Sequence, residues 1–249
     1  MKLQCVGDRR DFYKYDLLLG LAEALRPSGG VTVIPMLTRG GERPKEGGLR
    51  SYLAKHRDHE LWSLVRSLGG GDPSGFGSIV RFFAQRKIPF RFVPDGYFET
   101  DRRDRYFAQV AGPDLADCIV FLDPDIGLEV KSSSRRDTRY LAYEELRAVF
   151  RRMSGGSVLV LYQHMPRRPH SDVYTELVKR LFERSDIAHT HFLDMGDIGF
   201  LAAAQDLDPE RQAELARAVG RYAQSRGVRQ MSAGVSRTVL RRNEEAPME

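Results

Sequence analysis

Short runs of buried-type residues alternate with amphipathic segments along this chain. Leucines recur at helical spacing between Asp11 and Leu25, and Pro27 would end that helix. Runs rich in β-branched residues, such as Val31 to Met36, instead predict strands. The predicted helices span residues 11–25, 59–68, 78–86, 100–107, 143–153, 173–182 and 209–225, and the predicted strands span 31–36, 90–93, 119–122, 157–162, 191–194 and 199–204.

This order of elements predicts the class of fold. Strands that alternate with helices form βαβ units, and these build a mostly parallel sheet. The last two apolar runs are joined by Met195-Gly196-Asp197, which is a signal for an antiparallel hairpin. We therefore expect an α/β fold of the three-layer, Rossmann-like kind that ends in a C-terminal antiparallel hairpin. The expected single domain covers residues 1–242, and residues 243–249 are expected to form a disordered tail.

Composition excludes several classes of protein. No apolar run approaches the roughly 18 residues that a membrane-spanning helix needs. The N-terminal residues lack the apolar stretch of a signal peptide. The two cysteines, Cys5 and Cys118, form neither a disulfide framework nor a zinc cluster. We therefore expect a cytoplasmic protein without membrane contact, and its oligomeric state stays open.

Charge points to a class of partner. The formal net charge is +5, and arginines occur in pairs such as Arg135-Arg136 and Arg167-Arg168. Arginine suits two-pronged contacts to phosphate, so a basic face for nucleic acid or a nucleotide is one interpretation. The alternative is an ordinary solvated surface, because +5 is a mild excess over this length.

The run Ile119 to Leu122 ends abruptly in Asp123-Pro124-Asp125. A continuous apolar run of this length is typical of a strand that is covered on both faces. Ligands of open α/β sheets lie just beyond the carboxyl ends of such strands, so the two carboxylates indicate a site. The alternative is a polar turn in which Asp125 caps a neighbouring segment.

A second polar cluster lies near the N-terminus. Asp11 and Lys14 are three residues apart and would share a helix face, with Asp8 just before them. This arrangement suits a functional site. It also suits a helix N-cap with a surface ion pair that contributes only a few tenths of a kcal/mol.

A third cluster follows the predicted strand 157–162. His164 could act as a general base near neutral pH, Gln163 could read a base edge or a carbonyl, and Arg167 could hold phosphate. The alternative for His164 is a purely structural hydrogen bond. In the glycine-rich loop, Thr38, Arg39 and Gly40 could present backbone N–H groups to a carboxylate or phosphate of a cofactor.

The layout resembles that of class I S-adenosylmethionine-dependent methyltransferases. In those enzymes the first strand leads into a cofactor-binding loop, here Val31 to Gly41, and a mid-chain strand ends in an Asp-Pro-Pro-Tyr-like motif, here Asp123-Pro124-Asp125. Ile126 stands where the tyrosine of that motif would be. No Gly-x-Gly fingerprint follows the first strand.

A closer resemblance covers most of the chain. It is similar to a family of conserved hypothetical proteins without an assigned activity. The motifs that carry this resemblance are Gly7-Asp8, Asp11 to Leu18, Met36-Leu37-Thr38, Asp123 to Ser132, Tyr140 with Glu144, and Tyr162-Gln163-His164 with Arg167.

Three hypotheses about function follow. In the first, a methyltransferase-type domain binds S-adenosylmethionine or a related nucleoside and acts on nucleic acid or a nucleotide. In the second, a metal-dependent nuclease or phosphodiesterase holds Mg²⁺ or Mn²⁺ through Asp123, Asp125 and Glu129. In the third, a non-catalytic binding module has a degenerate cofactor site, which the missing glycine fingerprint favours. The candidate catalytic residues are Lys14, Asp123, Asp125 and His164, and the candidate cofactor-binding residues are Asp8, Asp11, Thr38, Arg39, Gly40 and Gln163.

Overall fold

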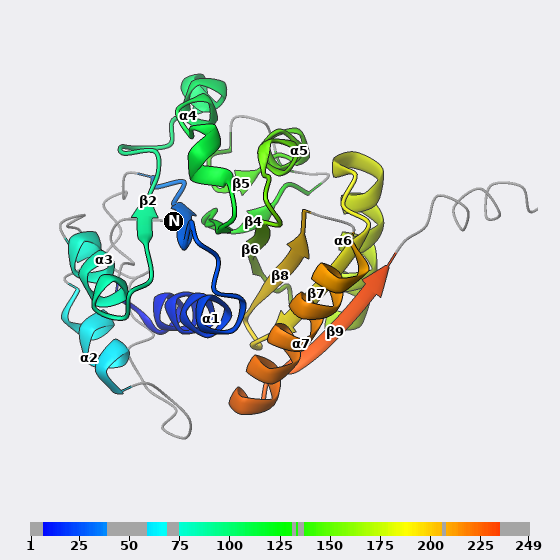
Figure 1. The fold of residues 1–249 in the computed structure, drawn as a ribbon. Helices are drawn as coiled ribbons and strands as arrows, with labels where there is room; N and C mark the ends of the chain where they lie inside the picture. The colour runs from blue at the N-terminus through cyan, green and yellow to red at the C-terminus, as the bar shows by residue number, and fades with distance from the viewer. Residues whose placement is uncertain are drawn as a thin grey trace, which may run out of the picture.

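A seven-stranded sheet with helices on both faces forms the centre of the protein in a computed structural model (Figure 1). The structure describes residues 7–38, 59–68, 75–130, 133, 137–205 and 208–234. The helices are α1 (Arg9–Leu25), α2 (His59–Ser67), α3 (Phe76–Gln85), α4 (Arg103–Ala108), α5 (Tyr143–Arg152), α6 (His170–Ser185) and α7 (Pro209–Arg226), with short 3₁₀ turns η4 (Thr100–Arg102) and η5 (Gly112–Leu115). The strands are β1 (Val31–Ile34), β2 (Phe90–Phe92), β3 (Ile119–Leu122), β4 (Gly127–Leu128), β5 (Tyr140–Leu141), β6 (Val158–His164), β7 (His189–Asp194), β8 (Ile198–Ala204) and β9 (Arg229–Gly234).

The strands of the large sheet lie in the order β2-β1-β3-β6-β8-β7-β9. Strands β2, β1, β3 and β6 pair in parallel. Strand β8 is antiparallel to both β6 and β7, and β9 is antiparallel to β7. The sheet is therefore mixed, and within its described strands only β8 and β9 run against the common direction.

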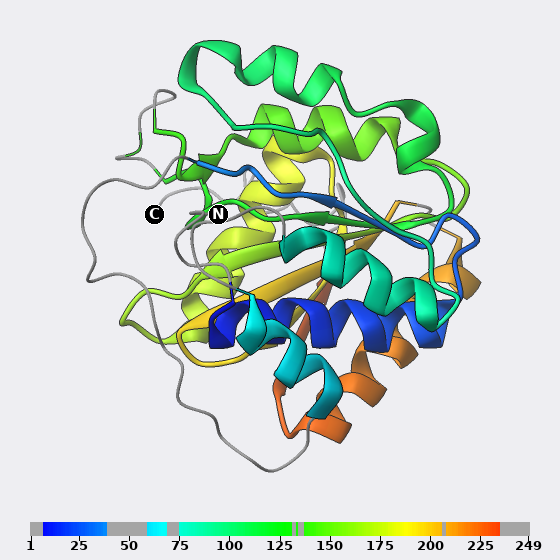
Figure 2. The same cartoon turned by 90° about the vertical axis from the view of Figure 1, so that its left-hand side faces the viewer.

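Side chains of successive strand residues point to opposite faces and fill two separate cores. Val33 and Phe121 contribute to the core under α1, α2, α3 and α7, whereas Ile34 and Leu122 contribute to the core under α4, α5 and α6. Figure 2 shows these two helical layers above and below the sheet. Since β1, β3 and most of β6 are fully buried, their sequences are continuously apolar rather than alternating.

The chain order of the strands reverses between β1 and β3. From β1 the chain crosses to β2 on one side, and from β3 it crosses to β6 on the other. Such a point leaves a crevice at the carboxyl ends of the two strands, where open α/β sheets bind their ligands. The backbone N–H of Asp123 donates to the carbonyl of Ile34 at 3.0 Å, which places Asp123 at this point.

Helix α1 is held by hydrogen bonds at its N-terminus and by contacts with α7. Asp8 caps its N-terminus by accepting hydrogen bonds from Arg10 and Asp11. Further along, the buried Asp16 carboxylate accepts from the Tyr222 hydroxyl at 2.8 Å and pairs with Arg226 at 2.7 Å, both on α7. These contacts fix the direction of α1 across the sheet.

The end of the chain differs from the sequence-based expectation. The antiparallel pair β7–β8 lies where the runs around Gly196 predict it, and α7 follows it as predicted, but a further antiparallel strand, β9, comes after α7. Strand β9 was not predicted, because Arg229–Gly234 carries polar and small residues and lies half-exposed at the sheet edge. The short β4–β5 pair was also missed, since two residues per strand leave no periodic signal. Strand β6 runs on through Gln163 and His164, which were expected to follow it.

The expected tail at residues 243–249 lies outside the described residues. Among the helices that are described, none combines the length and the apolar character that crossing a bilayer requires.

Candidate functional site

A buried lysine lies at the centre of the candidate site. Lys14 on α1 is only 5% exposed, and its Nζ lies 2.9 Å from Asp11 Oδ1 and 3.0 Å from Asp123 Oδ2. The ammonium also lies 4.7 Å from the centre of the Tyr162 ring, a cation–π distance. Burial would lower the pKa of Lys14, but the carboxylates of Asp11 and Asp123 raise it well above its usual value. Lys14 is therefore charged across the physiological pH range.

The first turn of α1 holds the carboxylates in place. Asp11 Oδ2 accepts from the Gly7 N–H at 2.8 Å, and Asp8 Oδ1 accepts from the N–H groups of Arg10 and Asp11 at 2.7 and 3.1 Å. Burial and the neighbouring Asp11 charge raise the pKa of Asp8. The predicted N-cap is present, but the ion pair beside it is buried rather than exposed at the surface.

Asp123 joins this turn to the sheet. It is 2% exposed and follows the last residue of β3. Burial raises the pKa of Asp123, and the Lys14 charge opposes that rise. The structure therefore brings Asp8, Asp11, Lys14 and Asp123 together at the strand-order reversal, although 109 residues separate Lys14 from Asp123.

His164 contacts Tyr162, whose ring also lies against Lys14. The Tyr162 hydroxyl lies 3.0 Å from His164 Nε2, within hydrogen-bonding distance. Burial and the Arg10 charge lower the pKa of His164 to about 4, so the imidazole is neutral at physiological pH. Arg10 in turn is held by Asp197 at 2.9 Å, from the turn between β7 and β8.

Gln163 has a structural role that its sequence position does not reveal. Its Oε1 accepts from the Leu128 N–H at 3.0 Å, and its Nε2 donates to the His164 carbonyl at 2.9 Å. Gly127 has φ +141°, and a Cβ there would lie 2.3 Å from Gln163 Oε1. The Gln163 amide therefore fastens β4 to the end of β6 and needs a glycine opposite it.

The three carboxylates of the metal hypothesis do not gather into one group among the described residues. Glu129 Oε1 accepts from the Tyr143 N–H at 3.2 Å and pairs with Arg184 at 2.8 Å, towards α5 and α6. Asp125 is half-exposed, whereas Asp123 pairs with Lys14. Within the described part of the chain, no group of three His, Cys, Asp or Glu side chains could hold a metal ion.

Two tyrosines near Asp123 were not among the predicted site residues. Burial raises the pKa of Tyr15, and nearby Asp11 and Asp123 raise it further. Burial also raises the pKa of Tyr106, which lies against the backbone of Met36 and near Asp123. Tyr15 belongs to the Asp11-to-Leu18 motif, but no sequence signal marks Tyr106, because it reaches the site from α4.

Thr38 lies within the described residues just after β1, whereas Arg39 and Gly40 lie outside them. The binding of a cofactor by the backbone N–H groups of this loop therefore stays a prediction.

Comparisons with known proteins leave the family open. No protein-family model matches the chain, and no curated protein matches it. Among solved structures, it is similar to the crystal structure of protein LPL1258 from Legionella pneumophila, described with the family model DUF519. The two chains share 9% sequence identity with a TM-score of 0.39, over 95% of this chain and 98% of the other. A TM-score this low does not establish a common fold, so the chemistry of the site rests on the contacts above.

Removing the charge of Lys14 should lower the stability of the fold, because its two carboxylate partners are buried. We expect Lys14→Met to lower the free energy of unfolding by about 3–5 kcal/mol, because Asp11 and Asp123 would remain buried without a counter-charge. Adding Asp11→Asn and Asp123→Asn to that variant should restore part of the loss. Urea denaturation at pH 7 measures both effects, and Lys179→Met, at an exposed lysine, is the control. Strict additivity of the three substitutions would contradict the coupling.

The Gly127–Gln163 contact can be tested with a matched glycine pair. Gly96 has φ +111° and open space where a Cβ would lie, whereas Gly127 faces the Gln163 amide. Gly96→Ala should cost about 1–2 kcal/mol from backbone strain alone. Gly127→Ala should cost about 1–3 kcal/mol more, because it displaces an amide that makes two hydrogen bonds. Equal losses in thermal or urea unfolding would show that the contact is loose.

The neutral state of His164 should destabilise the fold in acid. Between pH 6.5, the usual pKa of histidine, and pH 4, only the unfolded chain takes up this proton, so the folded state loses stability as the pH falls. After allowance for partial exposure, we expect about 1–2 kcal/mol of loss between pH 7 and pH 5 that His164→Gln does not show. His189→Gln, at an exposed histidine of β7, should keep the full wild-type loss.

Proposed function

We propose that this chain is a methyltransferase-like α/β protein that binds S-adenosylmethionine or a related nucleoside and acts on nucleic acid or a nucleotide. The observation that carries the proposal is the place of Asp123, which is buried and held by Lys14 where the strand order reverses between β1 and β3. Ligands of open α/β sheets bind in this crevice. The antiparallel strand β8, inserted beside a set of parallel strands, also fits the methyltransferase layout.

Backbone strain at the end of β1 supports a ligand there. Met36 is fully buried and has φ +37°, in the left-handed region that favours glycine. A residue with a side chain costs about 1–2 kcal/mol in that conformation, and such strain gathers at ligand sites. Met36 lies two residues beyond the strand that pairs with Asp123, so the strain and the charge cluster share one edge of the sheet.

The donor set fits a cofactor that carries an ammonium group and hydroxyls. Asp8 Oδ1 already accepts two N–H groups, whereas its Oδ2 accepts none from the described residues. An ionised carboxylate has about four acceptor positions, so Asp8 can take further donors. Asp8 and Asp11 would hold the cofactor from the α1 side, and Thr38 from the β1 side.

S-adenosylmethionine, when bound, supplies an electrophilic methyl group. Asp123 would accept a hydrogen bond from the N–H or O–H group of the acceptor and orient its lone pair. Lys14 favours the ionised form of Asp123 and fixes its position. Because its pKa is lowered to about 4, His164 is a weak proton acceptor, so Asp123 would take the proton that the acceptor loses.

The proposal is tested by ligand-induced stabilisation. S-adenosylhomocysteine at 100 times its dissociation constant should add about 2.7 kcal/mol to the free energy of unfolding, measured by thermal shift and confirmed by calorimetry. Asp11→Asn should remove at least nine-tenths of the affinity. Asp16→Asn is the matched control, because Asp16 is an equally buried carboxylate of α1 that faces α7 instead of the site.

The same measurements separate the alternatives. Stabilisation by Mg²⁺ or Mn²⁺ alone would favour the metal-dependent nuclease. No stabilisation by S-adenosylmethionine, S-adenosylhomocysteine, nucleosides or metals would favour a non-catalytic binding module. Equal loss of affinity in Asp11→Asn and Asp16→Asn would place the cofactor elsewhere.

A further inference from the structure

A buried tyrosine hydroxyl near the carboxyl end of β1 lacks a hydrogen-bond partner. Tyr106 on α4 is 3% exposed, and its hydroxyl bonds to none of the described residues. Its ring packs edge-on against Phe98 and Phe107, whose centroids lie 5.0 and 5.6 Å away. Because these rings hold it in place, the hydroxyl is kept from water. An unpaired buried hydroxyl lowers the stability of a fold, so a compensating role is expected.

The hydroxyl lies where the strand order reverses. It is close to the backbone N–H groups of Met36 and Leu37, just beyond β1, although neither makes a hydrogen bond to it. Asp123, at the end of β3, is near enough to influence the pKa of Tyr106. Tyr106 belongs to the core under α4, whereas Lys14 reaches Asp123 from α1 on the opposite face of the sheet. The hydroxyl and the charge cluster therefore approach the same strand ends from two sides.

The surroundings of the hydroxyl define the chemical group that it can bind. A phenol donates one hydrogen bond and accepts at its lone pairs. The N–H groups of Met36 and Leu37 face the oxygen, so its proton is left for a ligand. Burial and the charge of Asp123 raise the pKa of Tyr106, so the phenol keeps its proton and a negative charge beside it is disfavoured. The matching group is therefore an uncharged hydrogen-bond acceptor.

We propose that the Tyr106 hydroxyl donates a hydrogen bond to an uncharged oxygen or ring nitrogen of a ligand bound between β1 and β3. In the cofactor of the proposed function these acceptors belong to the nucleoside, whereas the amino-acid part carries charges. Tyr106 thus binds the nucleoside from α4, while Asp8 and Asp11 hold the ammonium group from α1. That the ligand is a nucleoside rests on the proposed function.

Access to the hydroxyl depends on Met36. This residue packs in the same core as Tyr106 and has a strained φ of +37°. Its unbranched side chain has three rotatable bonds, so it adapts to a neighbour more readily than the aromatic rings do. A ligand can therefore reach the hydroxyl when Met36 moves aside.

The test compares S-adenosylhomocysteine with 5′-methylthioadenosine, a nucleoside that lacks the amino-acid part. Tyr106→Phe removes only the hydroxyl, and it should weaken both ligands equally, by about five- to tenfold in calorimetric titration. A loss below about twofold for both ligands would overturn the proposal. A loss confined to S-adenosylhomocysteine would place the contact on its charged part and would overturn the assignment to an uncharged group.

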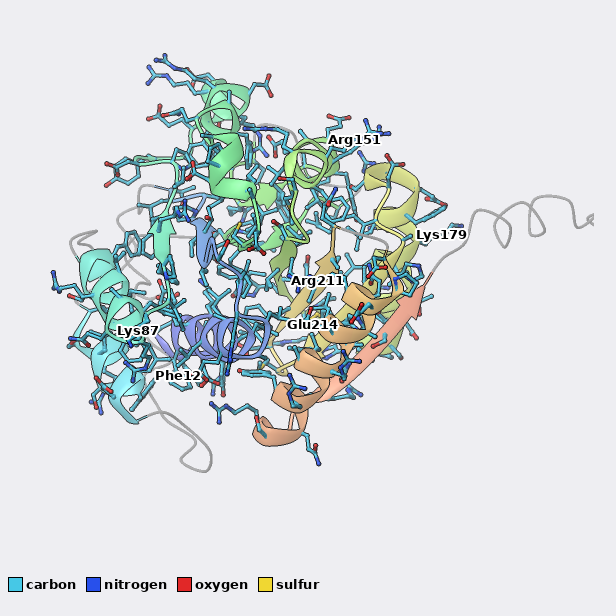
Figure 3. All side chains as sticks on the ribbon, in the orientation of Figure 1. Phe12, Lys87, Arg151, Lys179, Arg211 and Glu214 are labelled. Atoms are coloured by element: carbon cyan, nitrogen blue, oxygen red, sulfur yellow. The ribbon has the colours of Figure 1, made fainter. Side chains whose placement is uncertain are left out.

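A matched tyrosine separates binding from stability. Tyr143 is 1% exposed, and its hydroxyl also has no partner among the described residues, but its ring lies against Arg184 of α6. Tyr143→Phe should keep full affinity for both ligands, as should Lys179→Met at an exposed residue of α6 (Figure 3). Without ligand, Tyr106→Phe should unfold at no lower temperature than the unsubstituted chain, because it loses an unpaired hydroxyl. A decrease of more than about 3 °C would show a structural role instead and would overturn the proposal.

The outcomes also distinguish this proposal from the proposed function. If both ligands bind the unsubstituted chain and Tyr106→Phe equally well, the proposed function stands and the role of Tyr106 fails. If neither ligand binds the unsubstituted chain, the cofactor assignment fails and the role of Tyr106 fails with it. If only 5′-methylthioadenosine binds, and Tyr106→Phe weakens it, the contact stands for a related nucleoside and methyl transfer fails.

Discussion

The pairing of one buried ammonium with two buried carboxylates determines how the first helix meets the sheet. Removing these charges from water is costly, and only their mutual attraction at about 3 Å offsets that cost. The contact therefore requires α1 to lie at one position and one rotation over β3. The Tyr162 ring against the same ammonium extends this constraint to β6. The Lys14 ammonium thus fixes the relative positions of α1, β3 and β6. Hydrophobic packing alone would not specify these positions so narrowly.

Much of the layered fold is predictable from periodicity, because buried strands and amphipathic helices differ in their repeat. Strands β1, β3 and β6 are apolar throughout, and α7 has both its cap residue and its N-terminal proline in the expected places. The edges are less predictable. Strand β9 is polar and half-exposed, so its sequence resembles that of a loop. Its pairing with β7 depends on partners rather than on local preference.

The candidate site shows the same division. Asp123 was recognisable because an apolar strand ends at it, and Lys14 because it shares a helix face with Asp11. Their contact with each other was not predictable, since no local pattern joins residues so far apart along the chain. Gln163 shows the converse, because its polarity suggested recognition whereas its amide is used to fasten two strands.

The double anchoring of α1 has a consequence for how the protein is made. Lys14 needs Asp123 from mid-chain, and Asp16 needs Arg226 from the last helix, 210 residues away. Helix α1 therefore obtains the last of these partners only once α7 has been added to the chain. Until then Asp16 lacks its buried partners, and a chain that ends before α7 would lack these contacts of α1. The charge cluster around Lys14 can form once β3 is present, whereas the docking of α1 is complete only after α7 has joined it.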